Sequence, residues 1–376
     1  MELTVKRESF FKLLQKVQPI IEKKSTMPIL SHTLLDVKQD YIEVLATDLE
    51  LAFKGDCLAE VRQTGSIVVP ARELYEIVKN LNCERINLKE NENKWLEITG
   101  NGSYFCLASL PVEEFPLFPE TDHFNTVSIS GEVLRKAIMK TYFSIAKEDL
   151  NADYAGLCCE KIKDKEPKLR FVSTDTYRLT YMEIPFAEID SLQFDSRVMI
   201  PKKAALEILR LTSHENLYIG FDTQAGIVRT NGDLIYTRLM ENKFPEYQTF
   251  IPEKNEYEAK IPRINLKDIL KRMVVLVREK VKIAEFLFKK DSLIVRVENP
   301  AVGEAEEKLA IEFITSSTPV EKLKMSFNIS YLLDVLNALE SEVFTFGLNT
   351  GRTPCVITGE NDVGFKALVV PLIESE

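Results

Sequence analysis

The sequence has few of the residues from which metal sites are built. It contains only three histidines in 376 residues, and no two cysteines form a CxxC pair. Zinc sites draw most of their ligands from clustered cysteine and histidine, so we expect no metal and no cofactor. We predict that the thiols stay reduced in a cytoplasm; they are Cys57, Cys83, Cys106, Cys158, Cys159 and Cys355.

Short motifs of catalysis and of membrane insertion are also missing. The chain has no GxxxxGKS/T loop, no GxGxxG after a strand, no HExxH and no GxSxG, which excludes the commonest nucleotide and hydrolase sites. No run approaches the ~18 apolar residues of a membrane span, and the start, MELTVKRESF, lacks the apolar core of a signal peptide. These absences predict a cytoplasmic protein with no membrane partner.

Acidic residues are plentiful, so a carboxylate site has to be considered. Asp48 and Asp175 occupy matching turns and could form an acid/base pair, and Glu304, Glu306 and Glu307 could bind a metal. The two aspartates belong to separate repeats, however, and an aspartate in such a turn is more typical of turn capping. A carboxylate-metal enzyme stays an alternative, and we expect no catalytic residues.

The chain repeats its own pattern. The stretch Phe171–Met182 predicts a strand, a tight turn and a second strand, and Val44–Phe53 has the same order of apolar strand, Thr-Asp and apolar strand. Thr47 and Thr174 lie 127 positions apart, about one third of the chain, which is the spacing expected of three repeated domains.

Two helical patterns recur at a similar spacing. A strand followed by a helix with one apolar face is predicted at 67–81, 198–211 and 325–339, and a second amphipathic helix at 9–17, 130–145 and 263–277. Proline-rich stretches at 109–120 and 241–253 end the first two copies. We predict an α+β fold of three repeated domains, each with two helices and antiparallel sheets, at 1–122, 123–253 and 254–376.

Charge is distributed unevenly along the chain. The net charge is −10, yet the predicted helices together carry more basic than acidic residues. Basic residues recur at helical spacing opposite the apolar faces, as in Lys136 and Lys140 or Lys203 and Arg210. An ordinary solvated face explains any one of these helices, whereas the joint pattern favours weak, sequence-independent contact with phosphates.

Ten short motifs, in order from end to end, carry a resemblance to a known family. They are MPIL (27–30), VPAR (69–72), SLPVEEFP (109–116), FSIA (143–146), STDTYRL (173–179), IPKK (200–203), KFPEY (243–247), NP with EAEE (299–307), NISYLLDVLNAL (328–339) and VVPL (369–372). With them the chain resembles the bacterial sliding clamp, the beta subunit of DNA polymerase III.

The resemblance implies a non-catalytic processivity factor with the DNA-clamp fold. Two copies would join head to tail in a closed ring with twelve helices around duplex DNA. Its partners would be the polymerase III catalytic subunit, the clamp loader and other replication and repair proteins. Helices spaced roughly 9–10 Å apart would enclose a hole about 26 Å wide, enough for a duplex of roughly 20 Å. A multidomain adaptor that does not close a ring stays an alternative.

The resemblance also implies surfaces for DNA and for the second copy. Lys24 stands where the family has an arginine that touches DNA, and Lys202, Lys203 and Arg210 match basic positions facing the hole; the basic face of the helix at 130–145 adds Lys136 and Lys140. The dimer interface would join Val275, Leu276, Glu304, Glu306 and Glu307 to Ile77 and Tyr104 of the partner. Gly102 and Tyr104 replace family arginines, which predicts a more apolar, less salt-sensitive interface, although Val275 and Leu276 could instead belong to a domain core.

Finally, the resemblance implies a groove that captures the peptide tails of partners. Its residues would be Tyr154, Thr174, Thr176, Tyr177, Arg178, Leu179, Pro245, Phe250, Pro354, Val369, Val370, Pro371 and Leu372. We expect an apolar floor from Leu179, Val369 and Pro371, with Thr174 and Arg178 fixing polar groups of the peptide at the rim. Thr176 replaces a family glycine and should narrow the groove. The alternative is that this stretch is only a structural turn.

Overall fold

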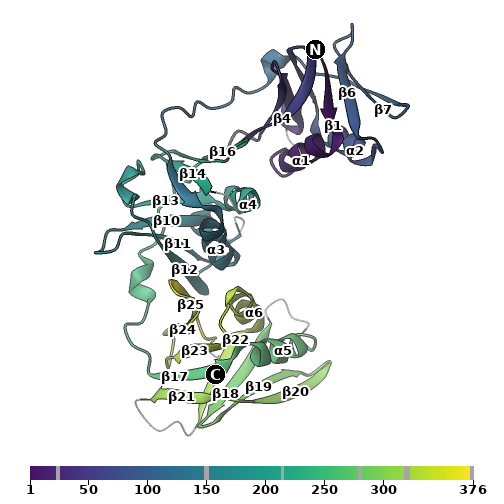
Figure 1. Cartoon of the computed structure of the whole chain (residues 1–376). Coiled ribbons are helices and arrows are strands. Elements are labelled where there is room, and N and C mark those ends of the chain that lie inside the picture. The colour runs from purple at the N-terminus through teal and green to yellow at the C-terminus, as the bar shows by residue number, and fades with distance from the viewer. Residues whose placement is uncertain (23–25, 148–151, 213–215, 278–281, 317–321, 373–376) are drawn as a thin grey trace. The chain divides into compact units, whose positions relative to one another are not determined.

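The computed structural model describes residues 1–22, 26–147, 152–212, 216–277, 282–316 and 322–372. They group into two compact units, which are described separately (Figure 1). Unit 1 comprises Met1–Glu132, Asp190–Phe194 and Leu206–Leu239, and unit 2 comprises Val133–Ile189, Asp195–Ala205 and Met240–Glu376.

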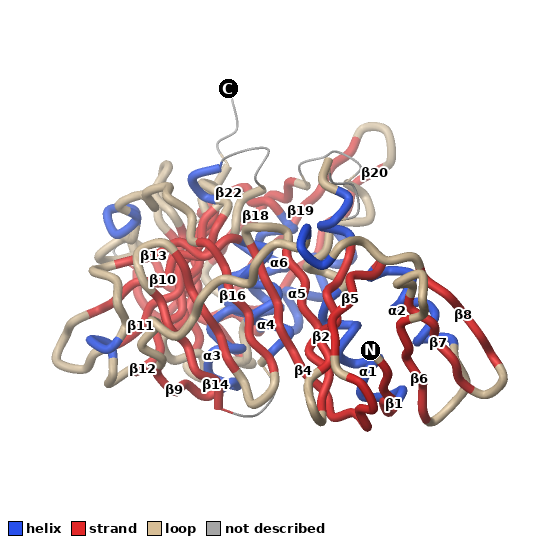
Figure 2. The backbone as a smooth tube through the Cα atoms, turned by 90° about the horizontal axis from the view of Figure 1, so that it is seen from above, coloured by secondary structure: helices blue, strands red, loops and turns tan. Residues whose placement is uncertain are grey.

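Unit 1 is built on one antiparallel sheet of twelve strands. Its main path runs β8-β7-β6-β1-β4-β16-β15-β14-β9, and β2, β3 and β5 branch from β4. In Figure 2, β6, β7 and β8 follow one another to the edge of this sheet. The strands are β1 Glu2–Lys6, β2 His32–Val37, β3 Tyr41–Thr47, β4 Leu51–Gln63, β5 Gly65–Pro70, β6 Arg85–Glu90, β7 Leu96–Gly100, β8 Ser103–Leu107, β9 Val127–Ser130, β14 Asn216–Phe221, β15 Ala225–Arg229 and β16 Asp233–Arg238.

Unit 2 contains a nine-stranded and a four-stranded antiparallel sheet. The larger sheet runs β13-β10-β11-β12-β25-β24-β23-β17-β21 and the smaller runs β20-β19-β18-β22. The larger sheet consists of β10 Gly156–Ile162, β11 Lys168–Thr174, β12 Arg178–Pro185, β13 Arg197–Pro201, β17 Tyr257–Pro262, β21 Glu312–Ser316, β23 Val343–Leu348, β24 Cys355–Gly359 and β25 Phe365–Val369. The smaller consists of β18 Ile283–Lys289, β19 Ser292–Asn299, β20 Gly303–Ala310 and β22 Leu323–Asn328.

Six α-helices occur among the described residues, one at each place where the sequence predicts a helix. They are α1 Arg7–Val17, α2 Ala71–Asn80, α3 Gly131–Thr141, α4 Lys202–Leu211, α5 Arg263–Met273 and α6 Ile329–Ala338. Helices α1 and α2 pack together in unit 1, and α5 and α6 do so in unit 2 (Figures 1 and 2). In α1, for example, the buried face is Phe10, Leu13, Leu14 and Val17, a spacing of three and four residues.

Several strands pass directly into helices through a proline. Pro70, Pro201 and Pro262 end β5, β13 and β17, and α2, α4 and α5 begin at the next residue. Proline cannot donate to a sheet ladder, and its fixed φ suits the residue before a helix. At α6 the same place is taken by Asn328, whose side chain accepts a hydrogen bond from the backbone N–H of Ser330.

Two helices end earlier than the sequence predicts. Helix α3 ends at Thr141, whose hydroxyl donates to the carbonyls of Ala137 and Ile138, and a 3-10 turn over Tyr142–Ser144 follows. Helix α5 ends at Met273, before Val274 and Val275. An α-helix is weakened by side chains that compete for its backbone hydrogen bonds and by β-branched residues. For these reasons each of the two helices ends four residues before its predicted end.

The middle third of the chain divides its strands between the units. Its β14–β16 continue the sheet of unit 1, where β16 pairs with β4, and its β10–β13 belong to unit 2, where β12 pairs with β25. These two antiparallel pairs explain why three sequence repeats form two compact units. Gly364, at φ +83°, allows the second pair because a Cβ there would lie 2.3 Å from the carbonyl oxygen of Glu183.

Candidate partner-binding pocket and charged surfaces

A tight turn between β11 and β12 positions the predicted groove residues. The Asp175 carboxylate accepts hydrogen bonds from the backbone N–H groups of Tyr177 and Arg178, each at 3.1 Å. The Thr174 hydroxyl donates to the carbonyl of Arg178 at 2.7 Å and accepts from the N–H of Thr176 at 3.1 Å. These bonds hold Thr176 at φ 76°, a conformation that glycine adopts readily and a β-branched residue does not.

Unit 1 contains the same turn between β3 and β4. There Asp48 accepts from the N–H groups of Glu50 and Leu51, and Leu49 has φ 77°. Both aspartates therefore cap turns, as the sequence indicates, and each binds backbone of its own turn.

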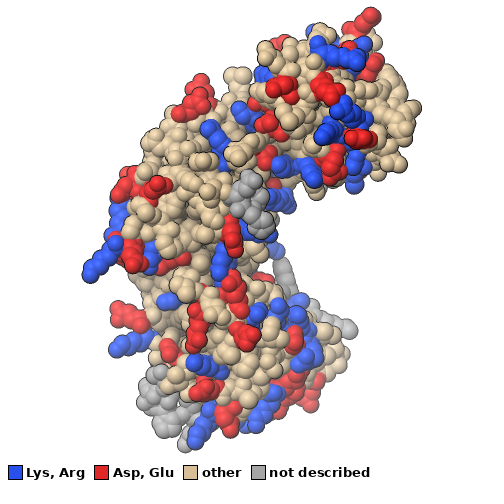
Figure 3. Space-filling view, in the orientation of Figure 1, with Lys and Arg blue, Asp and Glu red and all other residues tan. Residues whose placement is uncertain are grey.

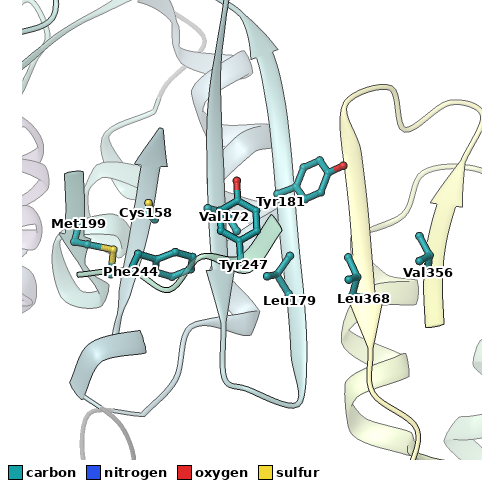
Figure 4. Close-up of a cluster of buried hydrophobic side chains, with 9 residues drawn as sticks. All are labelled: Cys158, Val172, Leu179, Tyr181, Met199, Phe244, Tyr247, Val356 and Leu368. Atoms are coloured by element: carbon teal, nitrogen blue, oxygen red, sulfur yellow. The ribbon is translucent and has the colours of Figure 1, made fainter. Parts of the chain in front are cut away.

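An apolar cavity of about 170 Å³ opens beside the second turn. Its wall combines β12, β25 and a 3-10 turn, η6, over Tyr247–Phe250. Leu179, Leu368 and Tyr247 belong to the buried cluster beneath it (Figure 4). The cavity is lined by Tyr154, Thr174, Thr176, Arg178, Leu179, Pro245, Tyr247, Phe250, Pro354, Leu368 and Val370.

The structure brings together nine of the thirteen predicted groove residues and places four elsewhere. Val369 is fully buried and does not line the cavity, because successive residues of β25 point to opposite faces of the sheet. Pro371 and Leu372 line a separate hollow next to Met325 and Thr350. Tyr177 is 55% exposed and stacks on Tyr331 outside the cavity.

The predicted floor is accordingly corrected. Leu179 stays, but Leu368, Val370 and Tyr247 replace Val369 and Pro371. The two-residue period of a strand could have identified Leu368 and Val370 as the pair on one face. Tyr247 stands in the KFPEY motif, but nothing in the sequence indicates that its ring faces the cavity.

The polar groups of Arg178 and Thr174 are turned to the protein, which corrects their predicted role at the rim. Arg178 donates to Asp175 at 2.9 Å, to Asp334 of α6 at 2.6 Å and to the carbonyl of Phe143 at 2.7 Å. Its guanidinium also lies 4.4 Å from the ring centroid of Tyr331. Arg178 thus joins β12 to α6, and the Thr174 hydroxyl is used within the turn.

The predicted DNA-contacting residues differ in their surroundings. Arg210 is exposed and pairs with Glu207, while Lys136 pairs with Glu340 at 2.9 Å. Lys202 is half-buried and donates to the carbonyl of Ile145 at 3.0 Å, and Lys203 is half-buried on the same helix, α4. Lys24 lies outside the described residues. Figure 3 shows basic and acidic side chains interspersed on the visible face of each unit.

The surroundings of Lys140 contradict its predicted place on an exposed basic face of α3. Its ammonium is buried with a side-chain exposure of 4% and forms an ion pair with Asp362. The Asp362 carboxylate also accepts from the Ser341 hydroxyl and from the N–H groups of Glu340 and Ser341. Burial alone would raise the pKa of Asp362, but the bonds from Lys140, Ser341 and the backbone lower it to about 2. We withdraw Lys140 from the DNA-contacting set.

Comparisons with known proteins agree with the resemblance found in the sequence. Models of the DNA polymerase III beta subunit match its N-terminal domain at residues 1–119, its central domain at 128–246 and its C-terminal domain at 248–373. The beta sliding clamp of Pseudomonas putida is 32% identical over 99% of this chain and 100% of its own length. The chain belongs to the bacterial sliding clamp family.

Solved structures of sliding clamps share the fold. A beta sliding clamp of Caulobacter crescentus matches with a TM-score of 0.92 and 27% identity over 99% of both chains. A sliding clamp of Bartonella birtlesii, solved with griselimycin bound, matches with a TM-score of 0.92 and 28% identity over 99% of this chain and all of that one. The predicted family and the α+β clamp fold of three domains are confirmed.

Family membership decides between the functions considered. The chain is a DNA polymerase sliding clamp, a non-catalytic processivity factor that works with DNA and with DNA polymerase III. The carboxylate-metal enzyme and the open adaptor are set aside. Within the described parts of the chain, no three or more His, Cys, Asp or Glu side chains are grouped to hold a metal ion, and none of the helices is long and apolar enough to span a bilayer.

The residues expected at a sliding clamp's dimer interface lie at two surfaces, one in each unit. In unit 1, Tyr104 is exposed on the edge strand β8, and Ile77 is half-buried on α2. In unit 2, Val275 is 74% exposed, which argues against a place in a domain core, and Leu276 is half-buried. Glu304, Glu306 and Glu307 lie on the edge strand β20, where Glu306 pairs with Arg296 and Glu307 with Arg272.

All six cysteines are free thiols. Burial raises the pKa of Cys57, Cys159 and Cys355 to about 12 in each case. Thiols with such pKa values stay protonated near neutral pH and react poorly.

Proposed function

We propose that two copies of this chain close head to tail into a ring around duplex DNA and that the pocket captures peptide tails of partner proteins. The partners are the polymerase III catalytic subunit, the clamp loader and other replication and repair proteins. The apolar cavity beside the Thr174–Arg178 turn carries the proposal. It is concave and mostly apolar, which suits aliphatic and aromatic anchors of a short peptide.

The two edge strands support ring closure. Strands β8 and β20 each end a sheet, so their outer backbone groups are open to pairing with another chain. Pairing β8 of one copy with β20 of the next is heterologous and closes after two copies. Because Glu306 and Glu307 already pair with arginines of their own chain, we propose an interface with little dependence on salt. Light scattering across a salt series tests this, and a monomer at micromolar concentration contradicts it.

Retention on DNA tests the ring itself. We expect the protein, once loaded, to stay on nicked circular DNA at low salt and to slide off after the circle is cut, because a ring binds by topology. Loss of binding at the same rate from circular and linear DNA would contradict the proposal.

The contribution of the basic residues needs a charge-matched control. Alanine at Lys24, Lys203 and Arg210 should reduce loading onto the circle several-fold, since each substitution removes a phosphate contact. Lys202 is left intact because its ammonium binds the Ile145 carbonyl. Alanine at the exposed hairpin lysines Lys165, Lys289 and Lys290 removes the same charge and should change nothing. Equal effects of the two triple variants would refute a specific basic lining.

The capture of partner tails is tested by fluorescence polarisation with a labelled peptide that contains a glutamine and has a Leu-x-Phe-like end. Saturable binding is expected, and its absence would contradict the proposed role of the pocket. A cytoplasmic location is also proposed, on the basis of the six free cysteines.

A further inference from the structure

Tyr247 connects the wall of the pocket to a buried polar network behind it. Its ring lines the cavity, and its hydroxyl lies at the end of the ring away from Leu179 (Figure 4). The hydroxyl donates to the Glu160 carboxylate at 2.5 Å and accepts from the Arg170 guanidinium at 2.8 Å. Glu160 and Arg170 do not line the cavity. Any influence of these two residues on the cavity therefore passes through Tyr247 and the η6 turn.

Glu160 holds the η6 turn at two successive residues. One carboxylate oxygen accepts from the Tyr247 hydroxyl, and the other accepts from the Gln248 side-chain amide at 3.1 Å. The same turn carries Phe250 and follows Pro245, and both residues line the cavity. Since Glu160 lies on β10, which is paired on both sides by β13 and β11, these two bonds tie one wall of the pocket to an inner strand of the sheet.

The charges of the network are balanced. Arg170 lies 3.5 Å from the Glu160 carboxylate and donates to Glu183 at 2.5 and 2.9 Å. Burial alone would raise the pKa of Glu183, but Arg170 and then Lys168 lower it. Burial, and next the Glu160 carboxylate, raise the pKa of Tyr247, so the phenol keeps the proton that it donates. A buried network in which the partners are satisfied is rigid.

The corresponding segment of unit 1 is built differently. Phe115–Glu120 has the FP start and PE end of Phe244–Glu253 but is shorter. It packs through Phe115, a member of one apolar cluster, and Phe118, which packs against that cluster and a second one. The polar network therefore accompanies the longer segment, which forms a pocket wall.

We infer that Glu160 and Arg170 are positioning residues that hold Tyr247 and the η6 turn in the conformation that accepts a peptide. The inference rests on the proposed role of the pocket. A wall that is already ordered lowers the conformational cost of binding, so loosening it should weaken affinity without removing any contacting atom.

Four variants of the network, three single and one double, test the inference in the full-length protein. Tyr247→Phe keeps the ring and removes the hydroxyl. Glu160→Ala removes the carboxylate that accepts a hydrogen bond from this hydroxyl. Each should weaken binding of the labelled peptide about 5- to 20-fold, the scale of one or two lost hydrogen bonds. The double variant should be little weaker than either single variant, because both changes break one network. Glu160→Gln keeps an acceptor for the phenol and should restore affinity to within about threefold of the unchanged protein.

A buried ion pair elsewhere in unit 2 supplies the control. Neither Asp362 nor Lys140 lines the pocket. Asp362→Asn disrupts their ion pair, so it should lower the melting temperature and leave peptide affinity unchanged. Hydrogen exchange should quicken at the amides of Tyr247–Ile251 in Tyr247→Phe and stay slow there in Asp362→Asn. Wild-type affinity with unchanged exchange in Tyr247→Phe overturns the inference, as does equal weakening by Asp362→Asn. If the unchanged protein binds no peptide, the proposed function fails, and the exchange rates still decide whether Glu160 and Arg170 hold the turn.

Discussion

The β4–β16 pair of unit 1 and the β12–β25 pair of unit 2 share one framework. Each follows a Thr-Asp turn whose third residue has a left-handed φ, 77° at Leu49 and 76° at Thr176. Each is also braced by a lysine from a helix. Lys16 of α1 pairs with Asp233, the first residue of β16, and Lys140 of α3 pairs with Asp362, which precedes β25.

The differences lie around this framework. The position of Leu51 in the first turn is occupied in the second by Arg178, which reaches α6. The short segment with Phe118 in unit 1 is replaced in unit 2 by the η6 turn and its polar network. The turn is therefore a structural element of both units. Whether it also borders a pocket depends on the segments that pack against it.

The largest expected effect separates the two turns by function. Leu179→Asp places a carboxylate in the apolar floor of the pocket and should weaken peptide binding more than about 100-fold, because an unpaired charge in an apolar site costs several kcal/mol. Leu49→Asp, at an exposed position of the first turn, should leave affinity unchanged. Fluorescence polarisation measures both, with circular dichroism as a check on folding. Undiminished binding by Leu179→Asp would rule the pocket out.

The two lysine–aspartate pairs should differ in how strongly the stability that they contribute depends on pH, which is a smaller effect. The pKa of Asp362 is lowered to about 2, below its unfolded value of about 4, so the pair stabilises the protein above pH 4 and loses this stability as pH falls towards 2. The loss should be about 1–2 kcal/mol in the free energy of unfolding.

Variants at the two aspartates check this. Asp362→Asn should lower stability at pH 7 and remove the acid dependence in that window. Asp233→Asn should change stability less, since the exposures of the Lys16 and Asp233 side chains are 42% and 13%, against 4% and 0% for Lys140 and Asp362. Urea titrations between pH 2 and 7 measure both, and equal responses would contradict the distinction.

The smallest effect concerns strain in the two turns. Glycine relieves a left-handed φ, so Thr176→Gly and Leu49→Gly should each stabilise the protein by about 0.5–1 kcal/mol after the entropy of glycine in the unfolded chain is subtracted. Only Thr176 lines the pocket, so only Thr176→Gly should also change peptide affinity. Thermal melts and polarisation measure the two effects. Loss of stability in both variants would show that neither turn is strained.

Much of the fold follows from local patterns. The turn bonds of Asp48 and Asp175 span two or three residues, and the apolar stripes of the helices repeat within one or two turns. Such features depend on neighbours in the chain, so the sequence predicts them. The family was predictable for a related reason, since its motifs are spread over the whole length in a fixed order.

Where the predictions about the site were wrong, the deciding contacts are distant in sequence. Lys140 looked like a member of a basic helical face, but its partner Asp362 is 222 positions away. Arg178 looked like a rim residue, but Asp334 is 156 positions away. No local pattern contains these pairings, because burial and charge compensation arise only when the strands and helices pack.

By itself, the sequence therefore determined the repeats, the turns, the helix faces and the family. The tertiary structure decided which faces of those elements meet. It put Leu368 and Val370 rather than Val369 at the cavity, because neighbouring residues of a strand point to opposite sides of the sheet. It also joined Tyr247 to Glu160 across 87 positions, because a buried hydroxyl and a buried carboxylate must each find a partner once they leave water.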